Sequence, residues 1–240
     1  MPPAERFRRA ARARTCHAAA VRALPDDQPW VFDLVSPDDT RRAAALARHG
    51  ALLAEATASR LRADDIWARQ GWSRAAENTV QRRLDRTLRG LVEAFCQAED
   101  PAVRAHYAPY AVLFLRWEER FLPELRTSWT HSPWTTKEAV LRDLARGGVP
   151  EEQHPEVAEL IVAALERPYR CKDWGYAGLL RHVAPVERLA ELDGDRAGFA
   201  RHVLAHPDLT VTRHTYPRWL AAQPAPSAAP PAPSAAPPAQ

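Results

Sequence analysis

The stretch SPDDTRRAAALARHGALLAEATASRL, residues 36–61, predicts a long helix. Its Ser-Pro-Asp-Asp start supplies an N-cap, a proline at the first helical position and acid in the first turn, all of which favour helix initiation. Leu46, Leu53 and Leu61 then recur at roughly helical spacing with alanines between them. We therefore expect one stripe of this helix to pack closely against a neighbour.

Similar helix signals recur along the whole chain. Asp100-Pro101 and His154-Pro155 each precede an apolar periodic run, and Thr135 with Glu138 forms a capping box that Gly147-Gly148 would terminate. Pro109 should kink or split the helix that contains it. With 9 glycines in 240 residues, the sequence predicts an all-α protein.

Two segments, WVFDLV at 30–35 and LTVTRHTY at 209–216, have strand-like composition. Each lacks an obvious partner, so we interpret both as extended connectors or frayed helix ends. The pentapeptide Asp100-Pro101-Ala102-Val103-Arg104 is similar to the D-P-x-V-R stretch that opens many HEAT repeats. Because no fixed period emerges, the predicted architecture is an irregular helical bundle or a degenerate stack of helix pairs.

Composition divides the chain into three parts: a basic amino-terminal helix and connector (1–35), a helical domain (36–222) and a Pro/Ala-rich tail (223–240). The tail repeats PAPSAAP and contains no charged residue, which is typical of an extended linker or solvated tail. Docking of the tail is the alternative, although no aromatic or basic residue flanks its prolines.

The sequence also bears on the compartment. Three cysteines, none close to another, argue against a disulfide framework. No apolar run is long enough for a membrane span or a signal peptide. We expect a cytoplasmic protein, or a nuclear one if the host is a eukaryote or its virus.

The segment DDIWARQGWSRAAENTVQRRLDRTLRG, residues 64–90, resembles the first half of a helix-turn-helix. Ile66, Gly71 and Ser73 match the end of a first helix, the turn and the cap of a second helix. Glu77, however, stands where that motif needs an aliphatic residue facing the first helix. The resemblance is therefore partial, and it implies DNA binding only as an alternative.

The spacing of Val80, Leu84, Leu88, Leu91 and Phe95 predicts a single helix after Ser73, with these residues on one face. On its other faces, arginines form a candidate nucleic-acid surface. Within it, Arg82, Arg86 and Arg89 would lie in a row. The candidates are Arg74, Arg82, Arg83, Arg86 and Arg89. An ordinary solvated face has the same pattern.

Two tryptophans, Trp129 and Trp134, lie in the Ser-, Thr- and Pro-rich connection LRTSWTHSPW at 125–134. Tryptophan is enriched in interface hot spots, so these two are the predicted partner-binding residues. Packing of the same rings onto their own helices is the alternative.

The sequence contains few motifs of the kind that bind metals or catalyse reactions. His202 and His206 are four residues apart and would share a helix face, but zinc needs further ligands, so we predict no metal site and retain these two as weak candidates. No phosphate loop, nucleophile elbow, HExxH or C-x-x-C is present in the sequence. We expect no cofactor and no catalytic activity. The alternative is a catalytic site that the fold assembles from residues distant in the sequence.

These observations lead to two functional hypotheses. The first is a helical adaptor or interaction protein whose partner is another protein. The second is a DNA- or RNA-binding regulator that uses the Arg-rich region at 66–90. Neither hypothesis involves a membrane.

Overall fold

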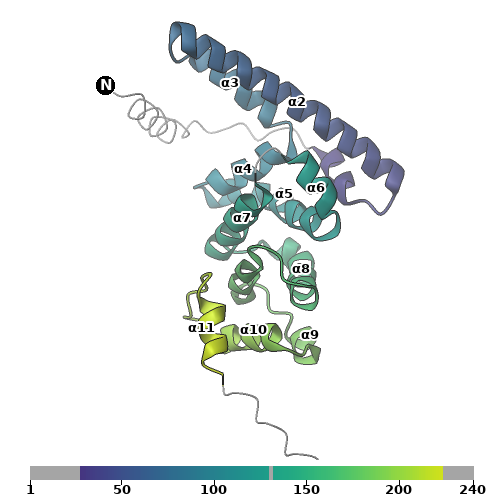
Figure 1. Cartoon of the computed structure of the whole chain (residues 1–240), viewed down its shortest axis with the longest axis vertical. Helices are drawn as coiled ribbons and strands as arrows, with labels where there is room; N and C mark the ends of the chain where they lie inside the picture. The colour runs from purple at the N-terminus through teal and green to yellow at the C-terminus, as the bar shows by residue number, and fades with distance from the viewer. Residues whose placement is uncertain (1–27, 130–131, 224–240) are drawn as a thin grey trace, which may run out of the picture. The chain divides into compact units, whose positions relative to one another are not determined.

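The computed structural model describes residues 28–129 and 132–223, and every secondary-structure element within them is a helix (Figure 1). The predicted all-α class is therefore confirmed. The chain divides into two compact units, Met1–Ser132 and Pro133–Gln240. This boundary lies inside the region 36–222 that the sequence analysis treated as one domain, and it falls within the Trp-containing connection.

Within residues 28–129, the first unit contains one 3₁₀ helix followed by five α-helices: η1 (Pro29–Val35), α2 (Asp39–Gln70), α3 (Arg74–Leu84), α4 (Leu88–Gln97), α5 (Pro101–Arg120) and α6 (Leu122–Ser128). The amino-terminal half of α2 packs against η1, and α4 packs against α5. The segment 30–35, which the sequence left as a connector or frayed helix end, is η1 and buries Val31 and Leu34 completely.

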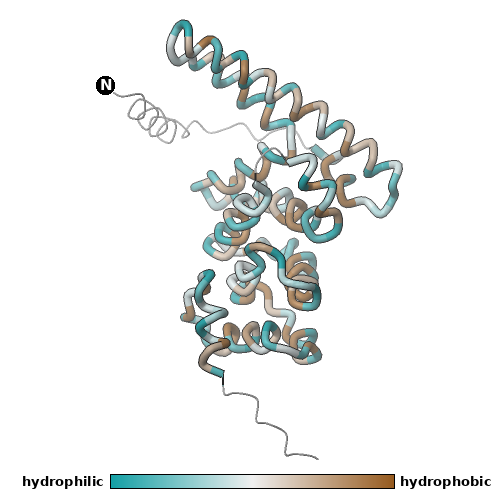
Figure 2. Tube along the Cα trace, in the orientation of Figure 1, coloured by the Kyte–Doolittle hydropathy of each residue, from teal (hydrophilic) through white to brown (hydrophobic). Residues whose placement is uncertain are grey.

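The long helix predicted from residues 36–61 is confirmed, with its start moved by two residues. Asp38, not Ser36, caps α2, because its carboxylate accepts hydrogen bonds from the backbone N–H groups of Thr40 and Arg41 at 2.8 and 3.1 Å. Apolar and polar residues alternate along α2 (Figure 2). Its buried face does not include Leu61, which is 65% exposed, so the predicted leucine stripe is wrong at that end.

Asp100 caps α5 as predicted, with its carboxylate 2.7 Å from the backbone nitrogen of Ala102. Pro109 does not split the helix, since α5 continues from Pro101 to Arg120. The middle of α5 is the core of the unit: Phe114 and Trp117 are completely buried.

A buried histidine lies inside an aromatic cluster in this core. The ring of His49, on α2, meets that of Trp117 edge-on at a centroid distance of 5.4 Å and stacks on that of Trp129 at 6.4 Å. His49 is completely buried, and neither ring nitrogen has a hydrogen-bond partner among the residues that the structure describes. Because burial disfavours the charged imidazole, it lowers the pKa of His49 from 6.5 to about 4.

This depressed pKa predicts that the first unit loses stability in mild acid. Between pH 6.5 and about 4 the unfolded imidazole binds a proton that the folded one does not. Stability should therefore fall as the pH falls through this interval, by about 3 kcal/mol. Amide hydrogen exchange at several pH values, which reports on each unit separately, checks this expectation.

The variant His49→Leu should remove most of that pH dependence, because leucine fills the aromatic cluster without titrating. His206→Gln, which changes an exposed histidine of the second unit, is the matched control and should leave the response of the first unit unchanged. A steep acid response that survives in His49→Leu would show that another group causes it.

The described part of the second unit, residues 133–223, contains two 3₁₀ helices and five α-helices: α7 (Pro133–Gly147), η2 (Glu151–Gln153), α8 (His154–Glu166), η3 (Asp173–Arg181), α9 (Val186–Glu191), α10 (Asp195–Ala205) and α11 (Thr215–Ala221). The 3₁₀ helix η3 is central, since it contacts α7, α8 and α10. Leu179 of η3 and Leu141 and Leu144 of α7 are completely buried.

The sequence located the ends of these helices with small errors. α7 begins at Pro133, so Thr135 lies inside the helix and the predicted capping box is wrong. Gly148 follows the helix with φ at 87°, as predicted for a terminating glycine. The strand-like segment 209–216 is a connection that leads into α11. The predicted basic helix within 1–27 and the tail at 224–240 lie outside the described residues.

Candidate interaction surfaces

The turn predicted at Gly71 and Ser73 is present. Gly71 has φ at 83°, a conformation that favours glycine, and ends α2. The hydroxyl of Ser73 accepts a hydrogen bond from the backbone N–H of Ala76 and caps α3. These two residues were identified correctly because each has a local backbone role.

The two helices joined by this turn form an antiparallel hairpin instead of a helix-turn-helix. Arg60 of α2 contacts Glu77 of α3 through two nitrogen–oxygen pairs at 3.2 and 3.3 Å, and Glu55 of α2 pairs with Arg83 of α3. The two helices run in opposite directions and lie side by side (Figure 1). In a helix-turn-helix the helices cross at a large angle, so that resemblance was wrong. Glu77, at the position where that motif needs an aliphatic residue, faces α2 as the ionic partner of Arg60.

The single helix predicted from Ser73 to Phe95 is also wrong. α3 ends at Leu84, and Thr87 caps a new helix, α4, by accepting a hydrogen bond from the backbone N–H of Gly90 at 3.1 Å. Val80 and Leu88 are both buried, so the apolar spacing is retained across a break. Because Arg82 and Arg89 lie on different helices, the predicted row of arginines does not form.

Acidic side chains pair with three of the five candidate arginines. Arg83 and Arg86 both contact Glu55, the latter at 3.5 Å, and Arg89 contacts Glu93 at 2.9 Å. Arg74 and Arg82 are exposed, and neither has an acidic partner within the described part of the chain. Residues 55–86 hold seven arginines against five acids, so this surface is only mildly basic.

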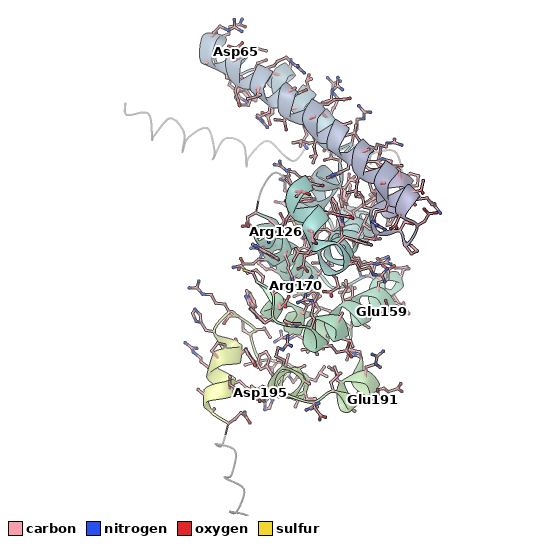
Figure 3. The ribbon with its side chains drawn as sticks, turned by 45° about the vertical axis from the view of Figure 1, so that its right-hand side comes forward. Asp65, Arg126, Glu159, Arg170, Glu191 and Asp195 are labelled. Carbon is pink, nitrogen blue, oxygen red and sulfur yellow. The ribbon has the colours of Figure 1, made fainter. Side chains whose placement is uncertain are left out.

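The half of the hairpin that contains the turn, residues 56–86, is called here its free half. It exposes two large apolar side chains. Trp72, in the turn, is 61% exposed, and Leu61, on α2, is 65% exposed. Asp65 marks the free end of the hairpin in Figure 3, where it pairs with Arg69. The exposure of these two residues was not predicted, because helical spacing assigned Leu61 to a packed stripe and no motif singled out Trp72.

Of the two predicted partner-binding tryptophans, Trp129 is a core residue. It is 6% exposed, and its ring lies 4.8 Å from that of Phe114. Packing onto its own helices, the alternative for this residue, is what the structure shows. Trp134 is half-buried at the start of α7, where its ring lies 6.0 Å from the ammonium of Lys137.

The two weak metal candidates lie together on α10. The rings of His202 and His206 are 4.1 Å apart between centroids, and Nδ1 of His206 lies 2.8 Å from the carbonyl oxygen of His202. Across residues 28–129 and 132–223, no group of three or more His, Cys, Asp or Glu side chains is placed to hold a metal ion.

A buried ionic cluster in the second unit was not predicted. The ammonium of Lys137, completely buried, lies 2.6 Å from the carboxylate of Asp173. Both guanidinium amino groups of Arg167 donate to the same carboxylate at 2.6 and 3.1 Å, and the backbone N–H of Arg170 donates to it at 2.6 Å. No short spacing in the sequence joins Lys137 to the rest of the cluster, because it lies 36 residues from Asp173.

Burial alone would raise the pKa of Asp173, but hydrogen bonds from Arg167 and Lys137 outweigh it and hold the pKa below its ordinary value of 3.8. The cluster therefore contributes its stability at every pH above about 3.8 and loses it as the pH falls further. The cluster joins η3, through Asp173, to Lys137 of α7 and to Arg167 at the end of α8.

Beside the cluster lies a pocket with five aromatic residues in its walls: Tyr169, Trp174, Tyr176, Phe199 and Tyr216. The rest of the lining consists of six aliphatic residues and two charged side chains, Asp173 and Arg196. Asp173 belongs to the buried cluster, and Arg196 donates to the backbone carbonyl oxygens of Ala164 and Arg167 at 2.9 and 2.5 Å. The charges at the wall are therefore already matched within the unit.

Within the described ranges, no helix has the length and apolar character needed to cross a lipid bilayer. Comparison of the chain with family models, with curated proteins and with solved structures found no match.

Proposed function

We propose that this chain is a protein-binding module whose partner docks on the free half of the α2–α3 hairpin. The observation that carries the proposal is Trp72, a tryptophan 61% exposed at the turn of the hairpin. Tryptophan side chains contribute strongly to interface affinity when a partner buries them. An exposed indole with Leu61 on the same hairpin is the kind of apolar surface that marks interaction sites.

The charges of the hairpin define the partner further. Most of its arginines are paired, which weakens the attraction of a polyanion such as nucleic acid. Arg74, two residues after Trp72, and Arg82 remain available to an acidic group. The proposed partner therefore has an apolar pocket for the indole with acidic residues at its rim.

An affinity-capture experiment tests this proposal. The full chain is immobilised and exposed to nuclease-treated host extract at moderate salt, and the captured proteins are identified by mass spectrometry. We expect a partner that wild type retains and Trp72→Ala loses, with affinity reduced on the order of tenfold or more. Because the indole is mostly exposed, Trp72→Ala should keep the wild-type circular dichroism spectrum and unfolding midpoint.

Val186→Ser is the matched control, since Val186 is 61% exposed on α9 of the other unit and should retain the partner. Undiminished capture by Trp72→Ala would contradict the proposal. So would capture that occurs only from extract without nuclease treatment, together with direct nucleic-acid binding that weakens steeply with salt and is lost in Arg74→Ala combined with Arg82→Ala.

A further inference from the structure

The aromatic pocket of the second unit is suited to an uncharged, proline-rich segment. Proline-rich peptides in the polyproline II conformation bind grooves lined by aromatic side chains. In this pocket Tyr169 is 54% exposed at the wall, whereas Phe199 and Tyr176 are almost completely buried beneath it. The pocket thus combines an accessible ring with a fixed aromatic floor.

The two charged side chains in the walls are already bonded within the unit and offer no free counter-charge to a charged occupant. Asp173 already accepts hydrogen bonds from Arg167, Lys137 and a backbone N–H, and Arg196 is bound to two carbonyl oxygens. A charged ligand would lose its hydration without gaining a counter-charge. An apolar, uncharged segment loses much less hydration free energy when it enters the pocket.

The chain itself carries such a segment in the sequence after α11. Residues 224–240 contain seven prolines and no charged side chain. They follow α11, whose Tyr216 lines the pocket and meets Phe199 edge-on at a centroid distance of 5.3 Å. Seventeen residues in polyproline II conformation would reach about 50 Å, and attachment so close to the site gives a high effective concentration.

We propose that residues 224–240 occupy the aromatic pocket of the same chain. The sequence alone favoured a solvated tail because no aromatic residue flanks the prolines, but the fold supplies aromatic residues from α10, α11, η3 and the connection before η3. The inference concerns the second unit and stands independently of the hairpin proposal.

Photo-cross-linking in the full chain tests the proposal. Tyr169 is replaced by benzoylphenylalanine, the dilute protein is irradiated, and the monomer band is analysed by mass spectrometry. We expect cross-links from position 169 to residues 224–240. Replacing Pro230, Pro231, Pro237 and Pro238 by serine should reduce them several-fold.

Benzoylphenylalanine at Val186, another exposed apolar position of the second unit, is the control and should not reach the tail. The proposal would be overturned by absence of tail cross-links from position 169, by equal cross-linking from position 186, or by cross-links that join two copies and disappear on dilution.

Discussion

Replacing Gly90 by alanine is expected to destabilise the first unit by about 3 kcal/mol. A Cβ atom at this position would lie 2.1 Å from the carbonyl oxygen of Leu84 and 2.4 Å from its carbon. Both are backbone atoms at the end of α3, so the contact cannot be relieved by rotating a side chain. The start of α4 would have to move away from α3, which would expose Leu88 and the α4–α5 packing.

Gly50→Ala is the matched control, because Gly50 also lies within a helix but has no atom within 4 Å of an added Cβ. Alanine there should stabilise α2 by roughly 0.5–1 kcal/mol, since glycine is a poor helix former. Chemical denaturation followed by circular dichroism measures both variants. Equal stabilities for Gly90→Ala and wild type would show that α3 and α4 do not approach each other at Leu84.

The second large effect is expected from Asp173→Asn, which should cost the second unit about 3–5 kcal/mol. The change leaves the completely buried ammonium of Lys137 without its anionic partner. Adding Lys137→Met should recover part of the loss, because the uncompensated charge is then replaced by an apolar chain of similar length. Denaturant unfolding monitored by hydrogen exchange reports on the second unit directly.

The partly solvent-accessible pair between Glu138 and Lys172, 2.7 Å apart, provides the control. Glu138→Gln removes an ion pair from the same helix α7 that carries Lys137, but it should cost at most about 1 kcal/mol because water screens this pair. Similar losses for Glu138→Gln and Asp173→Asn would show that burial of the cluster contributes little.

The sequence predicted features that depend on one backbone position. Asp100, Gly71 and Ser73 were assigned correctly because helix caps and turns require particular residue types at fixed places. The break between α3 and α4 was missed because Val80, Leu84, Leu88 and Leu91 keep helical spacing across it. Thr87 and Gly90 mark that break, but the prediction of a single helix used only the apolar periodicity.

Features that depend on contacts between distant residues were not predictable from spacing. Leu61 is exposed because the helix pairs with α3 through another face, which Glu55 and Arg60 help to define. The pairing of Lys137 with Asp173 and the burial of Trp129 against Phe114 likewise follow from tertiary packing. Periodicity shows that a helix has an apolar face but does not show which element will cover it.

Hydrogen exchange of the full chain with and without its captured partner is the most direct measurement of where that partner binds. If the α2–α3 hairpin is the binding surface, bound partner should slow exchange in peptides from residues 56–86, and the exchange of α7 to α11 should be unchanged. Protection confined to the second unit, with the hairpin exchanging as in the free chain, would contradict the account.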